Sequence, residues 1–137
     1  TLTEHLFTLK FHIQTTYKME IKYKIKVAND FSPYPAGRYR TEGKASGEAF
    51  LNDHLMAKLT AAIYENVILE IDLTGMNGYP SSFLSGSFGK FSYELGKLIG
   101  KKEASTLILK HIHFVCNDSN AKIKAVQDEI NNPITKK

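Results

Sequence analysis

The sequence predicts an α/β fold: one domain with a mixed β-sheet, crossover helices and an N-terminal β-hairpin or strand pair. Three observations predict it. From Ile21 onward, segments of strand periodicity alternate with segments of helical periodicity, the order that produces crossover connections. Val67–Leu73 (VILEIDL) is short, β-branched and mostly apolar, which is typical of a buried central strand. The length of 137 residues fits a single domain with its own core.

The first two predicted strands alternate apolar and polar residues. Residues 7–13 (FTLKFHI) alternate strictly, and Glu20–Val27 alternates again after a break at Thr15–Lys18. The apolar face of the second strand consists of Ile21, Tyr23, Ile25 and Val27, and its other face of Lys22, Lys24 and Lys26. Lysines on one face also keep an edge strand from pairing with other chains. Pairing of these two strands makes the predicted sheet mixed.

Three helices and a further strand are predicted downstream. Each helix follows a Ser or Asp, residue types that accept a backbone N–H at a helix N-terminus. In chain order the elements are an ordered loop at Asn29–Gly47, a helix from the cap Ser46 to about Asn66, a helix from Ser81 or Ser82 to about Leu98, a strand over Leu107–Phe114, and a helix capped by Asp118 or Ser119. The expected organisation is an N-terminal strand extension at 1–18, the domain at 19–131 and a flexible tail at 132–137.

The net charge of +4 is concentrated in one stretch. Lys18–Lys44 holds seven basic and three acidic side chains, which accounts for the whole excess. Such a zone suggests a phosphate, a nucleic acid or an acidic partner. Lysines on a solvated strand face explain the same charge equally well, and both interpretations remain open.

Composition also bears on location. The single cysteine, Cys116, can form no internal disulfide, and the first residues lack the continuous apolar core of a signal peptide. No run approaches the roughly 20 apolar residues of a membrane span. We therefore expect a cytoplasmic protein that makes no membrane contact.

Motifs of catalysis are missing. Ser85–Gly89 (SGSFG) comes close to G-x-S-x-G without matching it, and Gly89-Lys90 lacks the remainder of a phosphate-binding loop. His111 and His113 are expected to be solvated, because a metal site needs three or four ligands. We predict no enzyme, no metal and no cofactor. A serine hydrolase remains an alternative without a visible base.

Two separated segments carry a resemblance. The first, Gly37–Phe50, reads G-R-Y-R-T-E-G-K-A-S-G-E-A-F. The second follows one helix and one strand later and contains Asp72, Gly75, the pair Ser82-Phe83 and the pair Phe88-Gly89. Together they resemble the STAS-like domain family of unknown function, which is distantly similar to the STAS domains of anti-sigma-factor antagonists. The resemblance covers roughly Ile21–Ile130.

The resemblance implies a regulatory function. In the antagonists a serine at a helix N-terminus is the phosphosite, and the partner is a histidine-kinase-like ATPase of the GHKL type. It implies a non-enzymatic, partner-switching module that binds a protein, with Ser81 and Ser82 as phosphosite candidates. The alternative is a nucleotide- or nucleic-acid-binding module that uses the basic Lys18–Lys44 region.

Roles follow for the candidate residues. We expect Ser82 to cap the helix and Ser81 to be exposed and available for modification; the alternative is that both serines serve only as caps. Arg38 and Arg40 are expected near the Thr74–Ser82 loop, where they clamp an anion or pair with an acidic side chain. The candidates for anion or partner binding are Arg38, Arg40, Ser46, Glu48, Asp72 and Tyr79, and the candidate acidic partners of the arginines are Glu42, Glu48 and Asp72.

Overall fold

The computed structural model describes residues 1–4 and 19–134. The centre of the fold is a parallel β-sheet. Strands β1 (Ile21–Lys26), β2 (Ile68–Asp72) and β3 (Ile112–Val115) lie in the order β1-β2-β3. Leu69 and Ile71 of β2 are fully buried, and so is Leu73 directly after the strand. The predicted interior position of Val67–Leu73 is confirmed.

All strand pairs among the described residues are parallel. In register, Ile25 lies beside Ile71, which lies beside Phe114 on the other side. The antiparallel strand that would make the sheet mixed was predicted at residues 7–13, outside the described residues. The mixed character of the sheet therefore stays a prediction, whereas the α/β class and the crossover helices are confirmed.

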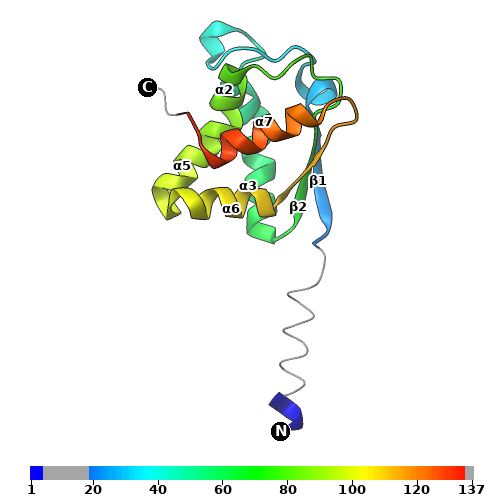
Figure 1. Cartoon of the computed structure of the whole chain (residues 1–137), viewed down its shortest axis with the longest axis vertical. Helices are drawn as coiled ribbons and strands as arrows, with labels where there is room; N and C mark the ends of the chain where they lie inside the picture. The colour runs from blue at the N-terminus through cyan, green and yellow to red at the C-terminus, as the bar shows by residue number, and fades with distance from the viewer. Residues whose placement is uncertain (5–18, 135–137) are drawn as a thin grey trace.

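Helical segments make each crossover. Between β1 and β2 lie a short 3₁₀ turn (Arg40–Glu42), α2 (Gly47–Phe50), a π-helical turn (Leu51–Leu55) and α3 (Met56–Glu65). Between β2 and β3 lie α4 (Ser81–Leu84), a π-helical turn (Ser85–Gly89), α5 (Lys90–Ile99) and α6 (Lys101–Lys110). Helix α7 (Asn120–Asn131) follows β3. A further π-helical turn, Val27–Phe31, follows β1. In Figure 1 the labelled helices lie to one side of β1 and β2.

Local signals set both ends of the first crossover. Ser46 caps α2, because its Oγ accepts the backbone N–H of Ala49 at 3.2 Å. Asn66 ends α3 in the left-handed conformation, with a φ of 58°. Apolar residues at helical spacing face the core between these ends, namely Leu51, Leu55, Leu59 and Ala62. The predicted helix from Ser46 to about Asn66 is confirmed.

The predicted strand at Leu107–Phe114 is wrong in its first half. Residues up to Lys110 form the last turn of α6, and only Ile112–Val115 is a strand. Gly100, with a φ of 106°, is the single residue between the end of α5 and the start of α6. Ala104 and Ile108 are buried four residues apart, so helical periodicity governs a run that resembles a strand in sequence.

Two glycines allow close backbone approaches, one between two helices and one between a helix and the loop before α2. A Cβ on Gly47 would lie 2.5 Å from the Phe83 carbonyl oxygen, and one on Gly86 would lie 2.6 Å from the Arg38 carbonyl oxygen. The aromatic rings of Phe50 and Phe83 meet beside this crossing, with centroids 5.5 Å apart. The crossing brings the loop before α2 against the helix that follows β2.

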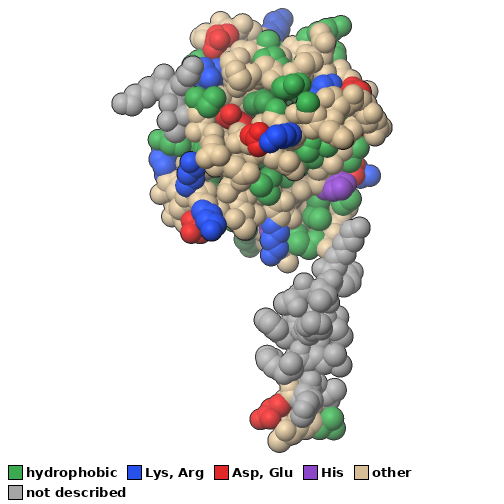
Figure 2. Space-filling model, in the orientation of Figure 1, with side chains coloured by type: hydrophobic (Ala, Val, Ile, Leu, Met, Phe, Trp, Pro, Cys, Tyr) green, Lys and Arg blue, Asp and Glu red, His purple; other side chains and the backbone are tan. Residues whose placement is uncertain are grey.

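Surface composition is mixed on the face that Figure 2 shows, where Lys and Arg side chains are spread out and interspersed with Asp and Glu. Within residues 1–4 and 19–134, no helix is both long and apolar enough to cross a membrane.

Candidate functional site

The β2–α4 loop carries the serines of the second motif. Asp72, at the end of β2, accepts the backbone N–H of Thr74 at 2.9 Å, and Met76 is buried in the core. The Asp118 carboxylate accepts the backbone N–H of Gly75 at 3.0 Å, which ties this loop to the β3–α7 loop. Asp72 therefore shapes the loop and does not pair with an arginine.

Ser81 and Ser82 are the first two residues of α4. Ser81 is exposed, Ser82 is half-buried, and Phe83 is buried. The N-cap residue is Pro80, and no side chain caps it, so the prediction that Ser82 is the cap is wrong. Proline has no side-chain acceptor, and it fixes its own φ in a range suited to a helix start. The expected exposure of Ser81 is confirmed, and Tyr79 beside it is 43% exposed.

The first motif builds a loop that is closed by backbone hydrogen bonds. Gly47 donates to the Gly37 carbonyl and Glu48 to the Arg38 carbonyl, both at 2.9 Å. The Glu48 carboxylate also accepts the backbone N–H of Arg40 at 2.8 Å. Ser46 is fully buried as the cap of α2. Ser46 and Glu48 are thus used by the fold itself.

The two arginines go to different places. Arg40 pairs with Asp53 at 2.8 Å, and this ion pair lowers the pKa of the Asp53 carboxyl and raises the pKa of Arg40. The expected acidic partners Glu42 and Glu48 contact only backbone N–H groups of this loop. Asp53 lies on the exposed side of the π-helical turn after α2, five residues beyond Glu48. The path of the folded loop brings the Arg40 guanidinium to this carboxylate.

Arg38 lies against the second motif. Its Nε donates to the Ser85 Oγ at 3.3 Å, and that hydroxyl donates to the Ile134 carbonyl at 3.3 Å. Within the described part of the chain, no hydrogen bond or ion pair uses the Nη atoms. The described side-chain hydrogen bonds of the two arginines are with Ser85, one turn beyond Ser82, and with Asp53, so a position near the Thr74–Ser82 loop stays a prediction.

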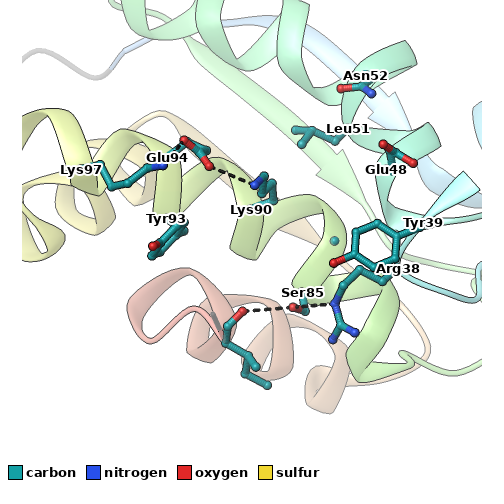
Figure 3. Close-up of a pocket in the computed structure, with 12 residues that line it drawn as sticks. Arg38, Tyr39, Glu48, Leu51, Asn52, Ser85, Lys90, Tyr93, Glu94 and Lys97 are labelled. Carbon is teal, nitrogen blue, oxygen red and sulfur yellow. Dashed lines mark hydrogen bonds and ion pairs between the residues drawn. The ribbon is translucent and has the colours of Figure 1, made fainter. Parts of the chain in front are cut away.

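A cavity opens beside Arg38, between α2 and α5. Its volume is about 390 Å³. It is lined by Arg38, Tyr39, Glu48, Leu51, Asn52, Ser85, Gly86, Lys90, Tyr93, Glu94, Lys97 and Ile134, and we call it the Arg38 cavity. Figure 3 shows α5 forming one wall and the residues of α2 and the following turn another, with Arg38 and Ser85 at one end.

The α5 wall is a charged triad. The Glu94 carboxylate accepts from Lys90 and from Lys97, each at 2.9 Å. The two ammonium groups lower the pKa of Glu94, and Glu94 raises the pKa of Lys97. One carboxylate thus serves two cations, so this wall keeps an excess of positive charge.

Comparison with protein families places the chain. The model of the STAS-like domain of unknown function matches residues 46–120, more than half of the chain. The chain belongs to this family. Comparison with curated proteins and with solved structures gave no match. The matched span begins at the α2 cap and ends at the first residue of α7, so it contains both serines and excludes Arg38 and Arg40.

The STAS-like domain has site residues that sequence reasoning missed. The Arg38 cavity is lined by Lys90, Tyr93, Glu94 and Lys97, none of which is a candidate from the sequence. The spacing of three and four residues around Glu94 was a visible signal of salt bridges on one helix face. Nothing in that spacing indicates that the face borders a cavity.

The remaining polar candidates have structural partners. His111 is 2% exposed, and its Nδ1 lies 2.9 Å from the Val67 carbonyl, so the expectation that it is solvated is wrong; His113 is exposed. Cys116 is half-buried, and its thiol donates to Asp118 at 3.0 Å. Burial and this carboxylate raise the pKa of the thiol. No group of three or more metal-binding side chains occurs in the described ranges, 1–4 and 19–134.

Proposed function

We propose that this STAS-like domain is a non-enzymatic regulatory module that binds a protein partner at the start of α4 and is switched by phosphorylation of Ser81. The observation that carries the proposal is the exposure of Ser81 at the first residue of a helical stretch that runs on to Ile99. This start lies beyond the carboxyl end of β2, the central strand.

The chemistry of the helix start supports an added phosphate. The first turn of a helix has backbone N–H groups without intrahelical partners and the positive end of the helix dipole. No side chain caps α4, and its first turn contains no acidic residue. A phosphate on Ser81 would add a charge of about −2 at a place that favours it. Tyr79 provides an exposed aromatic surface two residues away, a residue type enriched in protein interfaces.

The resemblance to anti-sigma-factor antagonists supplies the partner class. In those STAS domains a GHKL-type ATPase phosphorylates a serine at this helix start. We propose a histidine-kinase-like ATPase as the partner and a cytoplasmic setting for the exchange. The antagonists usually have an aspartate before the serine where this chain has Pro80, so recognition here would depend on the exposed loop and not on an acidic neighbour.

The test compares Ser81→Ala, Ser81→Asp and Ser82→Ala in the cells that make the protein. We expect mass spectrometry of the purified wild-type chain to find phosphate on Ser81, and Ser81→Asp and Ser81→Ala to retain different partners. Ser82→Ala is the matched control, and we expect it to retain phosphate and partners like the wild type. Phosphate confined to other residues, or identical partners for Ser81→Ala and Ser81→Asp, would contradict the proposal.

The nucleic-acid alternative depends on the basic Lys18–Lys44 region. Within it, Lys22 contacts Glu65, and Arg40 pairs with Asp53. These pairs reduce the charge available to phosphates, so this function has weaker support. A retardation assay over a salt series tests it, because affinity for nucleic acid falls steeply with salt.

A further inference from the structure

The Arg38 cavity has polar groups that neither the fold nor the proposed function uses. Its volume of about 390 Å³ falls at the small end of the range for ligand pockets, which is about 300–1,000 Å³. It is bordered by the loop before α2, by Ser85 and Gly86, by α5 and by Ile134, and Ser81 at the start of α4 is not among its lining residues.

Arg38 is held in place by its backbone and its Nε, and its Nη donors have no described partner. Its carbonyl accepts from Glu48, its backbone N–H donates to Glu42, and its Nε donates to Ser85. Ser85 is 5% exposed, and its hydroxyl donates to the Ile134 carbonyl. A guanidinium fixed in this way presents its remaining N–H groups at low entropic cost, as in sites that bind carboxylate or phosphate.

Nearby acidic groups leave Arg38 without an ion pair. Burial raises the pKa of the Glu129 carboxyl, and the positive charge of Arg38 partly opposes this rise. The Glu129 carboxylate accepts the backbone N–H of Ile134. None of the ion pairs among the described residues joins Glu129 to Arg38. Glu48 is engaged by the Arg40 N–H. Across the lining, three cations face two carboxylates, so the cavity favours a negative ligand.

The other walls suit a flat apolar group. Leu51 lines the cavity and is almost fully buried, and Tyr39 and Ile134 also line it while remaining exposed. In Figure 3 the Tyr39 hydroxyl points toward the interior, on the same side as Arg38. An aromatic ring beside a cation-rich end gives one site for an acid group and another for a ring.

We propose that the Arg38 cavity binds a small aromatic acid, with its carboxylate or phosphate at the Arg38 guanidinium and its ring against Tyr39 and Leu51. Both head groups present the same oxygen acceptors to a guanidinium, so the test separates them. Ser81 does not line this cavity and the experiment does not use it, so failure of this proposal would leave the regulatory proposal untouched.

The experiment is an NMR titration of the isotope-labelled full chain with benzoate, phenyl phosphate and benzamide up to about 10 mM, which detects millimolar binding. We expect saturable amide shifts at Tyr39, Ser85, Gly86 and Lys90 with at least one of the two acids. The acid that binds more tightly identifies the head group. Benzamide has the same ring without the charge, and we expect it to cause no saturable shift at these residues.

Arg38→Gln should weaken the binding of that acid by about tenfold, the loss of one charge-assisted contact. Arg40→Gln is the matched control, because Arg40 is paired outside the cavity, and its affinity should equal that of the wild type. Lys90→Gln tests the cavity again with an exposed side chain, should Arg38→Gln fail to fold, and it should also weaken binding. Equal shifts with benzamide, no saturable shift with either acid, or unchanged affinity in Lys90→Gln and any folded Arg38→Gln would overturn the proposal.

Discussion

Replacement of Gly47 by alanine tests the close crossing that aligns the two motifs. The new Cβ would lie 2.5 Å from the Phe83 carbonyl oxygen and 2.8 Å from the Gly86 Cα. Ordinary contacts begin near 3.5 Å, so the two segments must separate by about 1 Å. Both obstacles are backbone atoms, and no side-chain rotation can relieve the overlap.

The magnitude follows from two opposing effects. Overpacking of this kind costs about 1–3 kcal/mol. Alanine is favoured over glycine in a helix by at most about 1 kcal/mol, which offsets part of the cost. The net expectation is a loss of about 1–2 kcal/mol in the free energy of unfolding. For a domain of this size the melting temperature should fall by about 4–8 °C.

The assay is urea unfolding and thermal melting, each followed by circular dichroism. Gly96→Ala is the matched control, because its Cβ would have its nearest neighbour, the Lys101 Cα, at the ordinary distance of 3.4 Å. It makes the same chemical change inside α5 and should leave stability unchanged or raise it by up to about 1 kcal/mol. If Gly47→Ala melts at or above the wild-type temperature, the close crossing is not a constraint on this fold.

Three further predictions concern side chains with defined partners. Ser46→Ala should destabilise the domain by about 1 kcal/mol in urea unfolding, because the Ala49 N–H loses its cap. Burial raises the pKa of Glu129, so the folded state keeps the proton to higher pH than the unfolded state, and stability falls as pH rises through that interval; Glu129→Gln should therefore melt above the wild type at pH 7 and converge with it in acid. The Cys116 thiol, the Gly75 N–H and the Lys122 ammonium lower the pKa of Asp118, which has the opposite sign: its stabilisation exists above the unfolded pKa and is lost as pH falls. Asp118→Asn should thus melt below the wild type at pH 7, and the difference should shrink toward about pH 3; a constant difference across the pH range would contradict the assigned cause.

Elements with short-range signals could be predicted from the sequence. Val67–Leu73 is apolar because β2 is central, and Ser46 and Asn66 mark helix ends through their own backbone neighbourhoods. The Leu107–Leu109 run misled because three consecutive apolar residues suit a strand as well as the last turn of a helix. The deciding facts, the φ of Gly100 and the burial of Ala104 on one helical face, depend on how α6 packs.

Contacts between distant residues could not be predicted in the same way. Arg38 and Ser85 are 47 positions apart, and their hydrogen bond exists because Gly86 lets two backbone segments approach. Likewise, Asp53 was not among the predicted partners of Arg40, since the choice among nearby carboxylates depends on the path of the loop. Charge pairing could be anticipated at Arg40, whereas the identity of its partner, and the hydrogen bond of Arg38 to a neutral hydroxyl, required the fold.

The structure divides the first motif into residues that complete the fold and residues that still have binding capacity. Gly47 is required by the helix crossing, Ser46 by the start of α2, and Glu48 by the backbone of the preceding loop. Arg38 is different, because the fold uses its backbone and its Nε, no described contact uses its Nη donors, and the residue lines a cavity. A side chain used only for stability would gain nothing from such preorganisation, since its outermost donors contribute no contact. Of the residues in this motif, Arg38 is therefore the one whose replacement should separate ligand binding from folding.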